Sequence, residues 1–203
     1  MTIKVGDKVP SAKLKLMTPE GVKEVTTDEF FKGKKVVLFA VPGAFTPTCS
    51  AKHVPGFVQN EAALKKKGID TIACLSVNDA FVMGAWGKDQ KADGKVVMLA
   101  DGNGDFTRAV GLELDATANG LGKRSKRYAM VVDNGVVKTL NVEEPGAFEV
   151  SSAEAILKGL YSGQRPPRDL PLPQRERGTI RNFSTPPLLC PTGSSAPPGP
   201  GIR

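Results

Sequence analysis

One run of residues constrains the fold more than any other part of the chain. Residues 35–41 read KVVLFAV, which is apolar after its first residue, rich in valine, and without alternating polar positions. Such a run predicts a strand that is buried on both faces of a sheet. Because a sheet covered on both faces needs helices on each side, the run favours an α/β fold.

Helix and strand patterns alternate along the chain that follows. After a Pro/Gly-rich turn, residues 49–67 have the pattern of a helix, with Pro55 as a predicted kink. Residues 69–77 and 96–100 predict two more buried strands. Between them, residues 78–90 predict a helix capped by its first two residues, Asn-Asp. The order of these elements is that of βαβ units.

A hairpin and a helix complete the pattern. Residues 128–132 and 136–140 are strand-like and flank Asp-Asn-Gly at 133–135, a strong hairpin signal. Residues 151–154, Ser-Ser-Ala-Glu, resemble a capping box that opens a final helix. The elements together predict an α/β fold with a mixed central sheet flanked by helices.

The composition changes abruptly after Leu160. Ten of the sixteen prolines lie beyond it, together with six arginines and only two acidic residues. Such a segment has little apolar mass to bury and cannot form a regular helix or a central strand. The sequence therefore predicts one domain at 1–160 and a disordered Pro/Arg-rich tail at 161–203. A basic arm of this kind could recruit an SH3-like domain or an acidic surface, although it holds no complete recognition motif.

The charge and the apolar stretches limit the possible partners. The tail supplies +4 of the net charge of +7, and Lys and Glu are interspersed over the rest, which argues against nucleic-acid binding. The longest apolar stretch, 36–45, is too short to span a bilayer. Residues 1–7 resemble neither a signal peptide nor a transit peptide, so we expect a cytoplasmic location.

Cysteine and histidine are sparse in this chain. There are three cysteines, at 49, 74 and 190, and one histidine, His53. An odd, scattered set argues against a disulfide-stapled scaffold and for reduced thiols with a chemical or packing role. Because this set has no zinc-ligand spacing, we expect no metal site.

The strongest chemical signal is residues 42–49, PGAFTPTC. They deliver Cys49 to the first turn of a predicted helix, where backbone N–H groups and the helix dipole favour thiolate over thiol. The hydroxyl of Thr46 can reach the sulfur or a peroxide oxygen, while Pro42 and Pro47 make the loop rigid. A lone cysteine near a helix start is usually only a small buried residue. The pattern Pro-x-x-x-Thr-x-x-Cys favours a reactive one.

These motifs resemble those of type II, peroxiredoxin-five-like peroxiredoxins. The matching segments are 42–49, 52–57, 74–82 and 127–132, and the similarity runs from about residue 3 to Leu160. The resemblance implies a thioredoxin-like fold. It also implies reduction of hydrogen peroxide and alkyl hydroperoxides without a metal, haem or flavin cofactor.

The resemblance also implies a role for each matching residue. Cys49 would be the peroxidatic nucleophile that becomes a sulfenic acid. Thr46 would hydrogen-bond the sulfur and the substrate, and Arg127 would hold the thiolate and polarise the peroxide. Pro42 would shield the site, and the backbone N–H groups of Gly43 and Cys49 would orient the peroxide.

Two of these assignments have alternatives in the residues themselves. Arg127 ends the basic run 123–127, which could be a solvated loop end, and a slip in register would substitute Arg124 or Lys126. His53 follows Cys49 by four residues, so a Cys–His hydrolase pair is conceivable. The family resemblance instead makes His53 a supporting neighbour that hydrogen-bonds near the active site.

The route that regenerates Cys49 is less defined. Cys74 lies in a predicted buried strand and could be inert, yet plant-type relatives carry a resolving cysteine at this separation. Animal relatives place theirs near the start of the final helix, where residues 148–152 contain none. We expect glutathione and glutaredoxin as reductant, with thioredoxin as the alternative. Cys190 in the tail is a further, weaker candidate for a resolving thiol.

Three classes of function compete. The first is a peroxidase that turns over, and family resemblance adds a homodimer to it. The second is a redox sensor or holdase that uses the same cysteine without sustained turnover. The third is a thioredoxin-like disulfide reductase, which the sequence disfavours because Cys49 is followed by Ser-Ala-Lys and not by a Cys-x-x-Cys motif.

Overall fold

The computed structural model describes residues 1–162 of the chain. The elements, in chain order, are β1 (Lys13–Thr18), β2 (Gly21–Thr26), α1 (Thr27–Phe31), β3 (Lys35–Ala40), the π-helix η1 (Cys49–His53), α2 (Val54–Gln59), α3 (Glu61–Lys66), β4 (Thr71–Ser76), α4 (Ala80–Asp89), β5 (Val97–Ala100), α5 (Asp105–Ala109), β6 (Glu113–Ala116), the 3₁₀ turn η2 (Thr117–Asn119), β7 (Gly122–Ser125), β8 (Tyr128–Asp133), β9 (Val136–Val142) and α6 (Ala153–Ser162). The predicted tail lies almost entirely outside the described residues, so its disorder stays a prediction.

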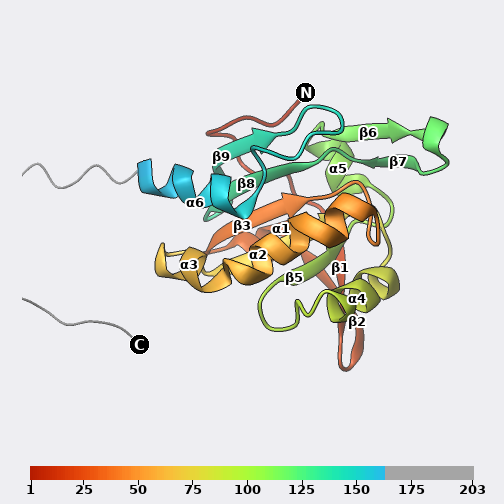
Figure 1. Cartoon of the computed structure of the whole chain (residues 1–203), viewed down its shortest axis with the longest axis horizontal. Helices are drawn as coiled ribbons and strands as arrows, with labels where there is room; N and C mark the ends of the chain where they lie inside the picture. The colour runs from red at the N-terminus through yellow and green to blue at the C-terminus, as the bar shows by residue number, and fades with distance from the viewer. Residues whose placement is uncertain (163–203) are drawn as a thin grey trace, which may run out of the picture. The chain divides into compact units, whose positions relative to one another are not determined.

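Seven strands form one mixed sheet in the order β2-β1-β5-β4-β3-β8-β9 (Figure 1). The central strands β3, β4 and β5 are parallel. β1 and β8 pair antiparallel to this centre, and β2 and β9 pair antiparallel to β1 and β8. β6 and β7 form a separate two-stranded hairpin. The predicted α/β fold with a mixed central sheet is confirmed, and it is the thioredoxin-like fold that the resemblance implied.

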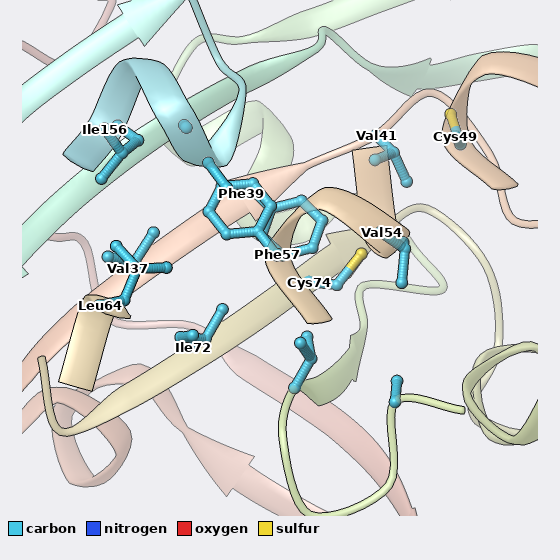
Figure 2. Close-up of a cluster of buried hydrophobic side chains, with 14 of the residues drawn as sticks. Val37, Phe39, Val41, Cys49, Val54, Phe57, Leu64, Ile72, Cys74 and Ile156 are labelled. Carbon is cyan, nitrogen blue, oxygen red and sulfur yellow. The ribbon is translucent and has the colours of Figure 1, made fainter. Parts of the chain in front are cut away.

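Hydrophobic clusters cover the sheet on both faces, and the apolar side chains of β3 contribute to both clusters. Val37 and Phe39 point to one hydrophobic cluster, and Val36 and Leu38 point to the other. The first cluster is completed by side chains of η1, α2, α3, α4 and α6, and the second by those of α1 and α5. Both described cysteines belong to the first cluster (Figure 2).

The strongest local signals match the observed elements. β3 fills the run at 35–41, and β8 and β9 form the predicted hairpin. Asn134 and Gly135 adopt φ angles of 47° and 80°, as the tight turn between these strands requires. Asp79 caps α4 as predicted, because its side chain accepts the N–H of Val82 at 2.9 Å. The hairpins β1–β2 and β6–β7 were not anticipated.

The helix predicted for 49–67 is confirmed over nearly its whole length, but it is not one kinked α-helix, since the segment divides into η1, α2 and α3. Pro55 has no N–H to donate to Ala51, and its ring would clash with the Ala51 carbonyl in a regular α-helix. The chain widens to a π-turn instead, in which the N–H of Val54 donates to Cys49 O. α2 ends at Asn60, whose side-chain amide donates to the Gly56 carbonyl at 2.9 Å.

The capping box predicted at 151–154 is also wrong in register. Ser152 caps α6, because its hydroxyl accepts the N–H of Ala155 at 3.1 Å. Ser151 is instead buried and bonded to Glu143, and the Glu154 side chain accepts from α2–α3 rather than from the cap. The helix begins where expected, but tertiary contacts choose which serine caps it.

Candidate active site

The loop at 42–48 joins the end of β3 to η1 and presents Cys49, which is fully buried. Asn78 anchors this loop, because its Oδ1 accepts the N–H of Ala44 at 3.0 Å and the hydroxyl of Ser76 at 2.7 Å. β3 and β4 are parallel neighbours, so the loops leaving their carboxyl ends meet. The site is therefore built at this edge of the sheet.

Arg127 reaches Cys49 from the strand on the other side of β3. β8 runs antiparallel to β3 with Tyr128 opposite Ala40, so the residue before Tyr128 lies where the cysteine loop leaves the sheet. The Nη2 atom of Arg127 donates to Cys49 Sγ at 3.4 Å. A permanently charged guanidinium at this distance stabilises a negatively charged sulfur.

The other basic side chains of the 123–127 run have different positions. Arg124 donates to the Leu121 carbonyl at 2.7 Å and to the Val77 carbonyl at 3.0 Å. Lys126 is exposed. The structure thus brings Arg127 to the sulfur and assigns Arg124 to holding two loops together.

His53 lies beside Arg127 and not on the sulfur. Its Nε2 faces the Ser151 carbonyl at 3.0 Å, and its Nδ1 faces Arg127 Nη1, also at 3.0 Å. Because a carbonyl only accepts and a guanidinium only donates, Nε2 carries the hydrogen and Nδ1 accepts. Burial, and then the charge of Arg127, lower the pKa of His53 to about 3. His53 is therefore neutral with both nitrogens in use, which leaves no lone pair for a Cys–His hydrolase pair.

Thr46, Gly43 and Pro42 form the turn in front of Cys49. The Thr46 hydroxyl donates to the Gly43 carbonyl at 2.9 Å, so its oxygen remains free to accept a hydrogen from a peroxide or a thiol. A Cβ at the buried Gly43 would lie 3.2 Å from Thr46 Cγ2 and 3.6 Å from Arg124 Nη1. A side chain here would therefore press on the threonine. Pro42 is half-buried at the mouth of the turn.

Cys74 lies in the middle of β4, with Phe39 of β3 and Met98 of β5 as its register partners. It is fully buried, and both Cys49 and Cys74 are free thiols. Burial, and then the charge of a Cys49 thiolate, raise the pKa of Cys74 well above its ordinary value. Cys74 is therefore a protonated thiol inside a central strand. Cys190 lies outside the described residues.

A cavity of about 360 Å³ opens beside Arg127. Its wall combines apolar and charged side chains, which are Pro42, Leu114, Val142 and Pro145 together with Lys126, Glu143 and Glu144. Cys49 is fully buried and does not line it. Of the predicted site residues, Pro42 and Arg127 line this cavity.

Several residues that shape the site were missed from the sequence. Asn78 holds the loop, and the Trp86 indole donates to the hydroxyl of Ser50 at 3.0 Å, beside Cys49. Glu143 and Ser151 form a buried pair behind His53. One signal was visible, since Asn78 is a polar residue directly after a buried strand; the others left no local pattern.

Two searches of the described part of the chain were negative. No helix within residues 1–162 is long and apolar enough to cross a membrane. No group of three His, Cys, Asp or Glu side chains in the same residues is placed to hold a metal ion.

A cysteine at a helix start, held beside a fixed guanidinium at the edge of a thioredoxin-like sheet, defines a thiol-dependent oxidoreductase. The family model described as redoxin matches residues 4–157. Chloroplastic peroxiredoxin-2E of Arabidopsis thaliana is 58% identical over 163 residues, which cover 78% of this chain and 70% of that protein. Peroxiredoxin-2D of the same plant is 52% identical over 159 residues, covering 78% and 98%.

Solved structures agree with these relatives. Reduced Prx3 from Vibrio vulnificus in complex with hydrogen peroxide is 57% identical, with a TM-score of 0.76 and coverage of 78% of this chain and 99% of that one. Peroxiredoxin 5 from Alvinella pompejana is 38% identical, with a TM-score of 0.71 and coverage of 79% and 99%. The chain therefore belongs to the peroxiredoxin family. It is a thiol peroxidase, whose substrates are peroxides and whose electrons come from thiol reductants.

Proposed function

We propose that Cys49 is the nucleophile that attacks the peroxide, with Arg127 and Thr46 as the groups that assist it. The observation that carries this proposal is the 3.4 Å contact between Arg127 Nη2 and Cys49 Sγ. The hydrogen peroxide complex of the Vibrio vulnificus relative supports a peroxide as the ligand of this chain.

The reaction is a displacement on oxygen. The Cys49 thiolate forms an S–O bond to one peroxide oxygen while the O–O bond breaks and its electron pair leaves with the other oxygen. That oxygen takes a proton to become water or an alcohol, and Cys49 becomes a sulfenic acid. Sulfur is oxidised by two electrons and the peroxide is reduced by two.

Each neighbour has a physical task in this step. Negative charge moves from sulfur to the leaving oxygen, and the Arg127 guanidinium can stabilise it at both places. The Thr46 oxygen can accept the hydrogen of the peroxide, because its own hydrogen is given to Gly43. Pro42 shields the turn, and the N–H groups of Gly43 and Cys49 orient the peroxide. His53 supports Arg127 through Nδ1.

We further propose that glutathione and glutaredoxin reduce the sulfenic acid, with thioredoxin as the alternative. Cys74 is paired within β4 on both sides, so it would have to leave the centre of the sheet to reach Cys49. A reductant that brings its own thiol needs only the opening of the 42–48 turn. The opening cost therefore disfavours Cys74 as a resolving cysteine.

Peroxide consumption tests the proposal. Wild type, Cys49→Ser and the matched core variant Cys74→Ala are given hydrogen peroxide or tert-butyl hydroperoxide, with glutathione/glutaredoxin or thioredoxin supplied separately. We expect turnover with glutathione/glutaredoxin in wild type and Cys74→Ala, and none in Cys49→Ser. Turnover in Cys49→Ser would overturn the assignment of the nucleophile. Loss of thioredoxin-driven turnover in Cys74→Ala would make Cys74 the resolving thiol.

The same assay separates the sensor or holdase from the peroxidase. Consumption of about one equivalent of peroxide, followed by arrest with every reductant, would favour stoichiometric sensing over catalysis. An insulin-reduction assay would identify disulfide reductase activity.

We also propose a homodimer and a cytoplasmic location. Phe45 of the 42–48 turn and Phe81 of α4 are 55% and 68% exposed, as apolar side chains at a subunit contact would be in a single chain. Light scattering of wild type and Phe81→Asp tests the dimer. The location rests on sequence alone and is tested by cell fractionation; two of the relatives carry chloroplastic in their names.

A further inference from the structure

A buried carboxylate lies beside the site, at the cavity next to Arg127, and has no part in the reaction described above. Glu143 follows β9 and is only 8% exposed. Its Oε1 accepts the N–H groups of Glu149 and Ser151, both at 2.7 Å, and the hydroxyl of Ser151 at 2.8 Å. Burial alone would raise the pKa of Glu143, but the hydrogen bonds from Ser151 and Glu149 lower it below its ordinary value. Glu143 is therefore an anion with three donors on one oxygen.

Two separate sets of hydrogen bonds connect Glu143 to Arg127. Its backbone N–H donates to the Arg127 carbonyl at 3.0 Å, which fixes the start of β8. Its carboxylate holds Ser151, and the carbonyl of Ser151 accepts the Nε2 hydrogen of His53 at 3.0 Å. The other nitrogen of His53 accepts from Arg127 Nη1 at 3.0 Å. Arg127 Nη2 then points at Cys49.

The segment tied by Glu143 also covers the guanidinium. The ring centroid of Phe148 lies 5.8 Å from the guanidinium carbon of Arg127 and 4.9 Å from the ring centroid of His53. Because Glu143 accepts the N–H of the very next residue, Glu149, the carboxylate helps to set where the phenyl ring lies. Arg127 is thus held at its backbone, at one nitrogen and along one face.

This arrangement orients Arg127 without neutralising it. Within residues 1–162, no carboxylate forms an ion pair with Arg127, and the acceptor on its Nη1 is the neutral His53. A carboxylate placed directly on the guanidinium would offset the charge that Cys49 needs. The carboxylate of Glu143 instead accepts hydrogen bonds from the N–H groups of Glu149 and Ser151 and from the Ser151 hydroxyl.

We propose that Glu143 is a positioning residue for the peroxidase reaction, which fixes the Ser151 carbonyl and, through His53, the direction in which Arg127 points at Cys49. The inference deepens the proposed function and rests on Cys49 and Arg127 acting as described there. Glu143 lines the same cavity as Arg127, but within residues 1–162 its carboxylate makes no hydrogen bond or ion pair with Arg127 or Cys49, so we expect its loss to act through Arg127.

A double-mutant cycle on the full chain tests this role. Single-turnover oxidation of Cys49 by hydrogen peroxide is followed by quenched thiol labelling in wild type, Glu143→Ala, Arg127→Ala and the double variant. We expect Glu143→Ala to slow oxidation by about tenfold to a hundredfold, as a misplaced catalytic group does. In the Arg127→Ala background the same change should cost less than about twofold, because both variants remove one interaction.

Two further variants keep the test decisive. Glu143→Gln keeps the shape and an acceptor oxygen but loses the charge, so it should slow oxidation by about threefold to tenfold, and it decides the question if Glu143→Ala does not fold. Glu154→Ala is the matched control, because Glu154 is an exposed carboxylate nearby whose side chain accepts from Asn60. We expect it to oxidise at the wild-type rate.

The outcomes separate the two proposals. A Glu143→Gln rate within about twofold of wild type would overturn the positioning role, as would equal losses in the presence and absence of Arg127. Failure of wild-type Cys49 to be oxidised would overturn the proposed function itself, whatever the Glu143 variants do.

Discussion

Cys49 and Cys74 are two fully buried thiols of one hydrophobic cluster, yet their surroundings differ in kind. Cys49 is the first residue of η1 and lies 3.4 Å from the guanidinium of Arg127. Cys74 lies inside β4 between two paired strands, where burial and a Cys49 thiolate raise its pKa. The comparison teaches that burial alone does not decide whether a thiol is reactive. A fixed positive charge beside the sulfur favours reactivity, and Arg127 supplies one at Cys49.

The backbone around the two thiols also differs, because Cys74 lies in a paired strand and Cys49 does not. β4 is hydrogen-bonded to β3 and β5 along its length, so exposing Cys74 breaks the middle of the sheet. Cys49 is the first residue of η1 and follows the 42–48 loop, so exposing it breaks no strand pairing. Local opening should therefore be far less costly at Cys49.

The largest difference should appear in alkylation of the two thiols. In a Cys190→Ser background, iodoacetamide should modify Cys49 at least about a thousandfold faster than Cys74, because opening β4 costs about 4 kcal/mol more. Mass spectrometry of labelled peptides measures both rates. In concentrated urea the two rates should converge, and comparable rates in the native state would erase the comparison.

The next largest effect should come from Arg127. Arg127→Ala should lower kcat/KM for hydrogen peroxide by about a hundredfold to a thousandfold, because the fixed charge beside the reacting sulfur is lost. Arg124→Ala is the matched control, since Arg124 donates only to backbone carbonyls in this part of the chain. Stopped-flow kinetics measure both. Equal losses in the two variants would mean that net charge, and not position, matters.

Thr46 should have a smaller effect of the same kind. Thr46→Val removes the oxygen that can accept the peroxide hydrogen, and we expect kcat/KM to fall by about tenfold to a hundredfold. Thr46→Ser keeps the hydroxyl and should restore most of the rate. A rate that falls in Thr46→Ser but is kept in Thr46→Val would instead make the methyl group and its packing against Gly43 the important feature.

The smallest expected effect is a pH dependence of the free energy of unfolding that is caused by His53, the neighbour of Arg127. His53 has an ordinary pKa of 6.5 when unfolded and about 3 when folded. Between pH 6.5 and 3 the unfolded chain therefore binds the extra proton, so the free energy of unfolding falls as the pH falls, by up to about 1.4 kcal/mol per pH unit. Urea unfolding at pH 6.5, 5.5 and 4.5 measures the slope.

His53→Gln should flatten that slope, because glutamine does not titrate but offers a donor and an acceptor. The urea measurements stop at pH 4.5, which is the ordinary pKa of the Glu143 carboxyl. The pKa of Glu143 is lowered from 4.5, so its own contribution to stability starts to be lost below that value. An unchanged slope in His53→Gln would show that other groups carry the acid sensitivity.

Local patterns predicted the elements whose signals lie within a few residues. The run at 35–41 predicted β3 because a strand buried on both faces leaves no polar positions, and Asn134-Gly135 predicted the β8–β9 turn. Asp79 predicted the start of α4 because a cap bonds within three residues. β6–β7 was missed because its strands are polar and leave no burial pattern.

The errors arose where distant contacts overruled local ones. Ser151 looked like a helix cap, but Glu143 takes its hydroxyl and its N–H, so Ser152 caps instead. The helix predicted at 49–67 breaks because Pro55 forces a π-turn upstream and Asn60 ends α2. A local pattern contains these residues, but it does not show which distant group each of them will bind.

The sequence by itself determined the turn that presents Cys49, because Pro42, Thr46 and the helix start act through bonds within a few residues. Only the tertiary structure decided which cation meets the sulfur and what holds that cation. Arg127 is 78 residues from Cys49, and Ser151 is 98 residues from His53. Contacts over such separations depend on the register in which β8 pairs with β3, and that register is set by the packing of the whole sheet.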